Sequence, residues 1–281
     1  MRDIQTKRIL FAGGSKFHRA TVFVKPRLCA TPFVFIGGSG RARLPPPTGA
    51  AYMRAMRVRA VCFDYGGTLD GPGDHWLERF FRLYHEHGLA LPWDAVRGAF
   101  DHATRTAYAD PATAALDLPA LVRAHAGWQM AYLGLDEKDR LARVTEAFVQ
   151  QSHAALAHSR GVLARLRPRL KLGVISNFYG NLERVLADAE IAPLLEATLD
   201  STCVGVQKPD AAIFSLAAAR LACAPAEILY VGDSFEKDIA GAHAAGLRTA
   251  WLVGGIERAC RAPELVDARL TRLDDLEALL E

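Results

Sequence analysis

Residues 58–70 read VRAVCFDYGGTLD, and this stretch decides the fold. It opens with a short apolar run, Val58–Phe63, which ends abruptly at Asp64 and at the glycine pair Gly66 and Gly67. A run of this length bounded by turn residues is typical of a strand that is buried on both faces. The stretch therefore predicts a core strand that delivers a carboxylate into a tight turn.

The hydrophobic period changes twice beyond this strand. From Asp74 to about His158 apolar residues recur at spacings of three and four, which is typical of helices, and after Gly161 strands and helices alternate. The helices expected in the first block cover residues 75–87, 93–108, 118–132 and 137–156. The later strands are expected at 172–176, 198–203, 228–231 and 248–253, and the later helices at 182–189, 211–221, 235–245 and 273–280.

This alternation predicts an α/β fold, namely a Rossmann-like, doubly wound parallel sheet with an inserted α-helical cap. We expect residues 56–73 and 159–281 to form the α/β core and residues 74–158 to form the helical cap. Residues 1–55 mix Gly-Gly, Pro-Pro-Pro and basic residues without a sustained period. We expect this segment to be disordered or to precede the true translation start at Met53 or Met56. An organelle transit peptide and a basic arm that touches phosphate are the alternatives.

Parallel sheets of this kind hold their chemistry outside the carboxyl ends of the strands. The polar residues there are Asp64 after the first strand, Ser176 and Asn177 after the second, Lys208 in a later loop, and Asp233 with Asp238 after another strand. A carboxylate can attack phosphorus and so split one difficult displacement into two easier steps. Hard oxygen ligands suit Mg²⁺, and a lysine neutralises charge on a phosphoryl group.

In order and spacing these four motifs resemble those of the haloacid dehalogenase-like (HAD) hydrolase superfamily. The helical block resembles the α-helical cap that one subgroup inserts after the first motif. The resemblance covers about Val58 to Leu280, and it implies an Mg²⁺-dependent phosphatase of a small phosphorylated metabolite. The implied roles are Asp64 as nucleophile and metal ligand, the Gly66 carbonyl and Asp233 as metal ligands, Asp238 as a second-shell residue or further ligand, Ser176 and the Asn177 backbone as phosphate donors, and Lys208 as the charge-neutralising residue.

One position departs from the phosphatases of this family. The residue two after the nucleophile is usually a second Asp that serves as general acid and then general base, and here it is Gly66. General acid–base help is worth about 10²–10⁴ in rate. Another residue could replace it, with Asp70, Asp74 and His75 as candidates, although turn and cap roles are expected for the two aspartates. Alternatively the substrate needs no acid, as with acyl phosphates or activated esters.

Other functions stay open beside the phosphatase. A catalytically impaired relative would bind a phosphorylated ligand or a protein partner. Dehalogenases of the family carry Tyr at the position of Gly66 and use no metal, whereas Tyr65 here is one residue earlier and Asp233 is retained. Phosphonatases carry a small residue there but need a cap lysine that forms a Schiff base. The lysine available between Asp74 and His158 is Lys138, which lies in a polar run.

The aromatic residues of the helical block carry one further expectation. Trp76 lies nearest the first motif and is the candidate for substrate contact. Helical spacing predicts that most of the others belong to the core of the block. These are Phe80, Phe81, Tyr84, Trp93, Phe100, Trp128 and Tyr132.

Composition excludes several other classes of protein. Apolar residues make up 51% and charged residues 23%, as in ordinary soluble proteins. No window approaches the roughly 18 apolar residues of a membrane-spanning helix. Residues 1–55 hold ten Lys/Arg and one acid, whereas residues 56–281 hold 24 basic and 30 acidic residues. Because the catalytic part is acidic, binding to nucleic acid is not expected.

The five cysteines point to a reducing compartment. They are odd in number and far apart, so they form neither a disulfide framework nor a metal-ligand pattern. We therefore expect a cytoplasmic protein. The cysteines are Cys29, Cys62, Cys203, Cys223 and Cys260.

Overall fold

The computed structural model describes residues 58–255 and 257–281, so the predictions for residues 1–55 lie outside the described residues. Its centre is a six-stranded sheet in the order β3-β2-β1-β4-β5-β6, in which every neighbouring pair is parallel. This confirms the predicted α/β class. The strands are β1 (Ala60–Phe63), β2 (Lys171–Ser176), β3 (Ala197–Asp200), β4 (Ile228–Gly232), β5 (Arg248–Leu252) and β6 (Ala268–Leu270).

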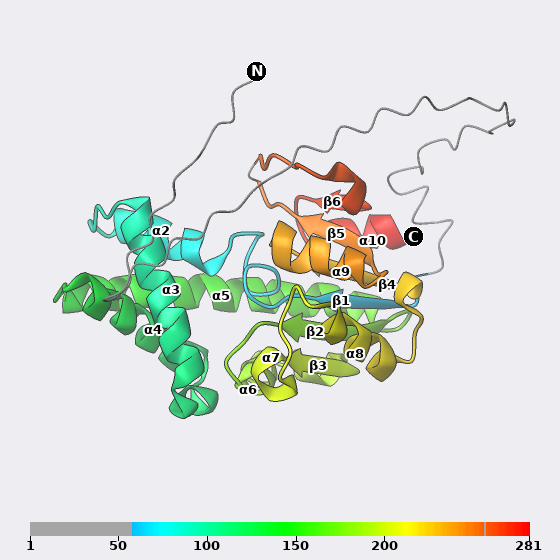
Figure 1. The fold of residues 1–281 in the computed structure, drawn as a ribbon, viewed down its shortest axis with the longest axis horizontal. Coiled ribbons are helices and arrows are strands. Elements are labelled where there is room, and N and C mark those ends of the chain that lie inside the picture. The colour runs from blue at the N-terminus through cyan, green and yellow to red at the C-terminus, as the bar shows by residue number, and fades with distance from the viewer. Residues whose placement is uncertain (1–57, 256) are drawn as a thin grey trace, which may run out of the picture. The chain divides into compact units, whose positions relative to one another are not determined.

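Four long helices separate β1 from β2, as the sequence predicts. Figure 1 shows α2, α3 and α4 at one end of the molecule, with α5 running from them toward the sheet. These helices are α2 (Trp76–Glu86), α3 (Trp93–Ala109), α4 (Leu118–Leu133) and α5 (Lys138–Leu166). The later helices are α6 (Leu182–Asp188), α7 (Ser201–Val204), α8 (Ala211–Leu221), α9 (Gly241–Ala244) and α10 (Asp275–Leu280). In the described part of the chain, no helix combines the length and the apolar character needed to cross a membrane.

Several expected boundaries are wrong, each for a local reason. The helix predicted to end at Leu156 continues through Gly161 to Leu166, because Val162, Leu163 and Leu166 are fully buried there. The strand predicted at 198–203 ends at Asp200, whose carboxylate accepts a hydrogen bond from the backbone N–H of Thr202 (2.9 Å) and caps α7.

Two further elements differ from the prediction in the C-terminal part of the core. The helix expected at 235–245 is a π-helical segment, Phe235–Ala240, followed by α9. Strand β6 was not predicted, because three residues give too short a pattern.

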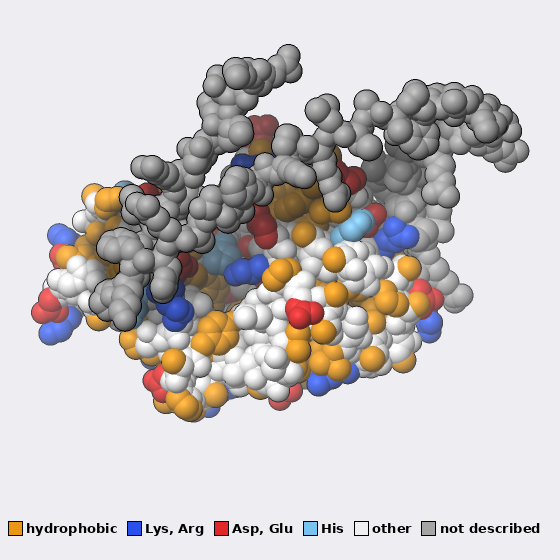
Figure 2. Space-filling model, viewed as in Figure 1, with side chains coloured by type: hydrophobic (Ala, Val, Ile, Leu, Met, Phe, Trp, Pro, Cys, Tyr) orange, Lys and Arg blue, Asp and Glu red, His pale blue; other side chains and the backbone are white. Residues whose placement is uncertain are grey.

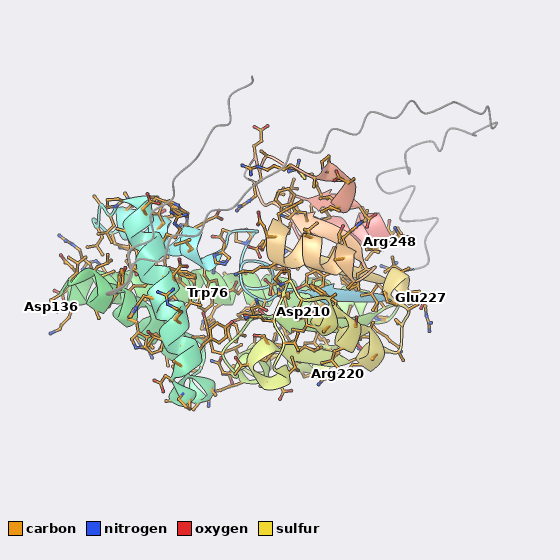
Figure 3. The ribbon with its side chains drawn as sticks, in the orientation of Figure 1. Trp76, Asp136, Asp210, Arg220, Glu227 and Arg248 are labelled. Atoms are coloured by element: carbon orange, nitrogen blue, oxygen red, sulfur yellow. The ribbon has the colours of Figure 1, made fainter. Side chains whose placement is uncertain are left out.

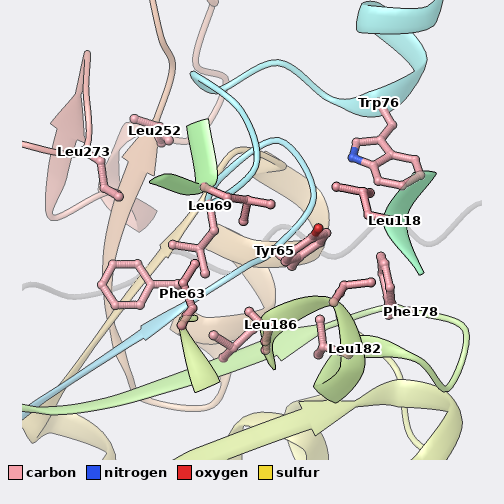
Figure 4. Close-up of a cluster of buried hydrophobic side chains, with 14 of the residues drawn as sticks. Phe63, Tyr65, Leu69, Trp76, Leu118, Phe178, Leu182, Leu186, Leu252 and Leu273 are labelled. Atoms are coloured by element: carbon pink, nitrogen blue, oxygen red, sulfur yellow. The ribbon is translucent and has the colours of Figure 1, made fainter. Parts of the chain in front are cut away.

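The central strand is buried on both faces. Val61 and Phe63 point into one apolar cluster, whereas Ala60 and Cys62 point into a second cluster on the other face. The first cluster also contains Phe80 of α2 and many other residues of the helical insertion, so insertion and sheet share one continuous core. Figure 4 shows part of it, with residues from β1, the loop after it and the insertion converging.

A buried arginine ties the loop after β1 to the insertion. Arg79 of α2 is 1% exposed, and it donates hydrogen bonds to both carboxylate oxygens of Asp74 (2.7 and 3.2 Å). It also donates to the backbone carbonyl of Asp70 and to Ser152 Oγ on α5, both at 2.9 Å. Its guanidinium lies over the ring of Phe148, 4.8 Å from the centroid. One side chain thus fixes three segments relative to one another.

We predict that Arg79→Leu destabilises the fold strongly. Removing one partner of a buried ion pair leaves an uncompensated charge and costs about 3–5 kcal/mol. The matched control is Arg97→Leu, since Arg97 forms an exposed pair with Asp94 on the surface of α3. That change should stay within about 0.5 kcal/mol of the wild type. Urea denaturation measures both free energies of unfolding, and equal values for the two variants would contradict this role of Arg79.

Candidate active site

Asp64 is the first residue after β1, between the ends of β2 and β4 in the sheet. It is 9% exposed. Its Oδ1 accepts hydrogen bonds from the backbone N–H of Tyr65 (2.7 Å) and from Ser176 Oγ (2.8 Å), and it lies 2.8 Å from Lys208 Nζ. Three segments that lie far apart in the chain therefore converge on the carboxylate of Asp64. Within the described residues these contacts all fall on Oδ1, which leaves Oδ2 as the freer oxygen.

Lys208 is the only cation in direct contact with this carboxylate among the described residues. Its Nζ also lies 2.6 Å from Asp238 Oδ1 and donates to the hydroxyl of Tyr230 at 2.9 Å. Burial alone would lower the pKa of Lys208, but the carboxylates of Asp238 and Asp64 outweigh it and raise that pKa. The ammonium therefore stays charged. Tyr230, which the sequence analysis did not single out, contributes from inside the apolar run of β4.

The side chain of Asn177 holds the Lys208 loop in place. Its Nδ2 donates to the backbone carbonyl of Lys208 (2.9 Å), and its Oδ1 accepts from the backbone N–H of Lys208 (2.7 Å). This reciprocal pair fixes the main chain from which the Lys208 side chain starts. The predicted donation from the Asn177 backbone to a phosphoryl group does not compete with it, since that donation uses the main chain of Asn177 and not its side chain.

Three buried carboxylates lie together at this edge of the sheet. Asp64, Asp233 and Asp238 each offer an oxygen within 4.8 Å of the others. Burial first, and then the charges of Asp238 and Asp64, raise the pKa of Asp233 well above its ordinary value. Burial also raises the pKa of Asp238 to about 6, against the opposing effect of Lys208. One ammonium does not balance three carboxylates, so the hard oxygen donors fit a divalent cation such as Mg²⁺.

The two glycines after Tyr65 face different constraints. Gly67 has φ +82°, and a Cβ there would lie 2.7 Å from Asp233 Oδ2, so a side chain would collide with the carboxylate. A Cβ on Gly66 would instead meet Trp76 Nε1 at 3.6 Å, an ordinary contact distance. The backbone therefore requires glycine at position 67 but not at position 66. At Gly66 the edge of an indole ring faces the space into which a side chain would project.

Asp70 and Asp74 are held by partners other than Asp64. Asp70 accepts hydrogen bonds from the backbone N–H of Gly67 (2.6 Å) and from Trp76 Nε1 (2.7 Å), and Asp74 is paired with Arg79. Asp70 therefore closes the turn at Gly67, whereas the turn expected for it was Gly71-Pro72-Gly73. The expected capping role of Asp74 is wrong, because the N-cap of α2 is His75, whose Nδ1 accepts from the backbone N–H of Leu77 (3.2 Å).

His75 lines the cavity, and its ring is uncharged near neutral pH. Burial first, and then the charge of Lys237, lower the pKa of His75 to about 4. The ring is therefore neutral, and because Nδ1 accepts a hydrogen bond, the proton sits on Nε2. In this state His75 offers the site a hydrogen-bond donor and neither an acid nor a free base.

A cavity of about 400 Å³ opens over Asp64. Beside Asp64, Gly66, Ser176, Asn177 and Lys208 it is lined by residues that include His75, Trp76, Phe100, Thr104, Tyr108, Phe178, Tyr179 and Lys237. Trp76, the candidate for substrate contact, is among them, and Figure 3 shows it where the insertion meets the core. Figure 2 shows side chains of both charges and histidine gathered along the same junction. The sequence patterns did not identify Phe178 and Tyr179 as site residues, although both directly follow the Ser176-Asn177 motif.

Most of the aromatic residues predicted for the core of the insertion lie there, with two exceptions. Trp93 and Tyr132 are 40% and 54% exposed, so they do not belong to the core. Phe100 packs with Phe80 and His75 and also lines the cavity. Helical spacing identifies a buried face but does not say which buried residues border a cavity.

Behind the cavity wall runs a chain of buried polar groups. Tyr84 OH donates to Gln129 Oε1 (3.1 Å), and Gln129 Nε2 lies 2.9 Å from Nδ1 of His125. The other ring nitrogen of His125 lies 3.3 Å from the hydroxyl of Thr104, which in turn hydrogen-bonds Tyr179. Because the amide NH₂ of Gln129 donates to Nδ1, the proton of His125 sits on Nε2 and points at Thr104.

Comparison with known proteins identifies the family of this chain. The family model for haloacid dehalogenase-like hydrolases matches residues 58–246. A phosphoserine phosphatase of Thermus thermophilus is 33% identical over 122 residues, which are 42% of this chain and 49% of that protein. The pyrimidine 5'-nucleotidase YjjG of Escherichia coli is 31% identical over 115 residues, 39% of this chain and 51% of that protein. The chain thus spans about half the length of these curated relatives.

Solved structures show the same fold at low identity. A dehalogenase structure with an intermediate complex has a TM-score of 0.57 at 18% identity and covers 80% of this chain and 98% of its own. The HAD-hydrolase YfnB from Bacillus subtilis has a TM-score of 0.50 at 17% identity and covers 80% and 99%. At these identities the likeness describes the fold alone.

We predict that His125 makes stability depend on pH. Burial lowers the pKa of His125 to about 3, from an ordinary value of 6.5. Between pH 3 and pH 6.5 the ring of His125 is therefore protonated in the unfolded chain and neutral in the folded chain. The contribution of the neutral ring is therefore complete above pH 6.5 and is lost as the pH falls toward 3.

In His125→Gln the free energy of unfolding should fall by about 2 kcal/mol less between pH 7 and pH 5 than in the wild type. Urea titrations at the two values measure it. His153→Gln, at an exposed position of α5, is the matched control and should keep the wild-type dependence. The prediction fails if His125→Gln and the wild type lose equal stability.

Proposed function

We propose that this chain, which belongs to the haloacid dehalogenase-like hydrolases, is an Mg²⁺-dependent phosphatase of a small phosphorylated metabolite. The observation that carries the proposal is the carboxylate of Asp64, held 2.8 Å from both Ser176 Oγ and Lys208 Nζ beside two further buried aspartates. The names of the phosphatase relatives support the same reaction class.

In this mechanism Asp64 attacks the phosphorus and forms an aspartyl-phosphate. The bond from phosphorus to the leaving oxygen breaks, and that oxygen departs with the electron pair. Lys208 and Ser176, together with the backbone N–H of Asn177, would hold the phosphoryl oxygens and stabilise their charge. Water then cleaves the aspartyl-phosphate and releases inorganic phosphate. The reciprocal hydrogen bonds between Asn177 and the Lys208 loop keep this set aligned.

Asp64, Asp233 and the carbonyl of Gly66 would hold the Mg²⁺. When bound, the ion neutralises charge on the carboxylates and on the phosphoryl group. Asp238 is better suited to orientation than to direct ligation. Its Oδ1 meets Lys208 and Tyr230, and its Oδ2 accepts from the backbone N–H of Ser234 at 3.0 Å. A Cβ on Gly232 would come within 2.4 Å of Asp238 Cγ, so glycine makes room for this carboxylate.

Gly66 sets the limit of this activity. Of the residues that line the cavity in the described chain, Asp64 is the only carboxylate. No second carboxyl group is in place to protonate a leaving oxygen, since Asp70 and Asp74 are engaged elsewhere and the ring of His75 is neutral. The reaction therefore suits leaving groups that depart without a proton, such as those of acyl phosphates or activated esters.

The other functions fit the site less well. Lys138 is 87% exposed and paired with Asp136, whereas a Schiff-base lysine should be desolvated. Tyr65 is fully buried against Phe178 and does not line the cavity, which argues against a dehalogenase role. A binding protein without turnover would not need the contact of Lys208 with two carboxylates. We further propose that residues 74–158 act as the cap over a cytoplasmic enzyme's site, with residues 56–73 and 159–281 as its core.

Asp64→Asn should abolish turnover while preserving the fold. The amide is isosteric but is not a nucleophile, so phosphate release from acetyl phosphate should fall at least about 10³-fold. Chelation of Mg²⁺ from the wild type should have a similar effect. The control is Asp94→Asn, at an exposed position of α3. Release of phosphate by Asp64→Asn at the wild-type rate would exclude the aspartyl-phosphate.

Gly66→Asp should add the missing proton shuttle. Position 66 has no left-handed φ and leaves 3.6 Å between a new Cβ and Trp76, so the side chain can be accommodated. We expect kcat on an alkyl phosphate to rise by about 10²–10⁴. Gly66→Asn, equal in size but unable to transfer the proton, is the matched control and should show no gain. If the two variants behave alike, Gly66 is not what limits the reaction.

A further inference from the structure

We infer that the physiological substrate is the phosphate ester of an aromatic hydroxyl, with its ring held in the cavity over Asp64. The inference rests on the proposed phosphatase function and names its substrate class. Two independent features of the site lead to it: the loss of acid catalysis beside the leaving oxygen, and an aromatic wall in the region where the leaving group must lie.

The first feature is chemical. Trp76 faces the space at Gly66, and its only N–H is donated to Asp70 Oδ2 at 2.7 Å. His75 keeps its Nδ1 occupied by the backbone N–H of Leu77. Besides Asp64, no carboxyl group of the described chain lines the cavity to protonate the leaving oxygen, so the site favours a leaving group that can depart as an anion. A phenolic oxygen has a pKa near 10, as in tyrosine, whereas an aliphatic alkoxide is about as basic as hydroxide, whose parent acid has a pKa of 15.7. A phenol is thus a leaving group that this site can expel unaided.

The second feature is the wall itself. Tyr108 of α3 and Tyr179 of the loop after β2 meet at 4.9 Å between ring centroids, and Phe178 lies 5.3 Å from Tyr179. The ring of Trp76 is the fourth member of this wall, with its centroid 6.3 Å from that of Phe178. All four side chains line the same cavity as Asp64. Planar rings pack edge-to-face or offset against such side chains, which an aliphatic phosphate cannot do.

The size and polarity of the cavity fit one such ring. A volume of about 400 Å³ lies at the lower end of the range for small-molecule sites, which runs from about 300 to 1,000 Å³. The hydroxyl of Tyr179, which lines the cavity, can form a hydrogen bond with a polar substituent on the ring.

The reaction balances without a further reagent. Asp64 forms a bond to phosphorus, the bond from phosphorus to the aryl oxygen breaks, and the aryloxide leaves with the electron pair and takes a proton from water. Hydrolysis of the aspartyl-phosphate then consumes one water and returns the carboxylate.

Four phosphate compounds distinguish the effect of an aromatic ring from the effect of a good leaving group. Phenyl phosphate has a ring and a good leaving group, benzyl phosphate a ring and a poor one, acetyl phosphate a good leaving group without a ring, and propyl phosphate neither. With Mg²⁺ and the full-length chain, we expect phenyl phosphate to exceed benzyl phosphate in kcat by about 10²–10⁴. Benzyl phosphate should exceed propyl phosphate about tenfold in kcat/KM, through KM. In Gly66→Asp the advantage of phenyl over benzyl phosphate should collapse.

A variant of the wall tests the ring separately. Tyr179→Leu should lower the ratio of kcat/KM for phenyl phosphate to that for acetyl phosphate about tenfold. Tyr132→Leu, which alters an exposed tyrosine outside the cavity, is the matched control and should keep the wild-type ratio. Circular dichroism of both variants verifies folding.

The possible outcomes distinguish the inferred substrate class from the proposed phosphatase function. Cleavage of acetyl phosphate that depends on Asp64, with phenyl phosphate no better than benzyl or benzyl no better than propyl, would overturn the substrate class and leave the phosphatase standing. An unchanged ratio in folded Tyr179→Leu would do the same. Failure of the folded protein to cleave any of the four phosphates would overturn the proposed function and the substrate class with it.

Discussion

The site depends on one buried ammonium group, that of Lys208. It lies within 3 Å of Asp64, Asp238 and the hydroxyl of Tyr230. These three residues come from the end of β1, the π-helical segment Phe235–Ala240 and the middle of β4. Without this charge, three carboxylates would face one another in a region largely closed to water, where like charges repel most strongly. The same ammonium would meet the phosphoryl group, so the group that allows the site to fold is also the group that would make it reactive.

Much of this arrangement could be predicted from the sequence. A buried central strand places Asp64 at the carboxyl edge of the sheet, and the alternation of strands and helices brings Ser176, Lys208 and Asp233 to the same edge. Other contributions could not be predicted. The hydroxyl of Tyr230 lies inside an apolar strand pattern, and the partners of Arg79 come from segments far apart in the chain. Such pairings depend on how packed elements meet, which hydrophobic period alone does not encode.

The indole of Trp76 takes part both in the packing of the fold and in the site. It packs against Phe148 of α5 and donates to Asp70, so it belongs to the joint between insertion and core. It also borders Gly66, where related phosphatases are expected to carry an acid. The same indole that packs the insertion against the core therefore lies beside Gly66, the position that lacks the acid. A site of this kind keeps its nucleophile and its charge-neutralising lysine but would depend on the substrate to supply a good leaving group.

The most direct test of this account is to look for the covalent intermediate. The full-length protein would be incubated with acetyl phosphate and Mg²⁺, quenched in acid, and its peptides analysed by mass spectrometry. The account predicts one added phosphoryl group on the peptide that contains Asp64, sensitive to hydroxylamine as acyl phosphates are, and absent from Asp64→Asn. Phosphate release from acetyl phosphate without any such adduct on Asp64, even at the earliest quench times, would contradict it.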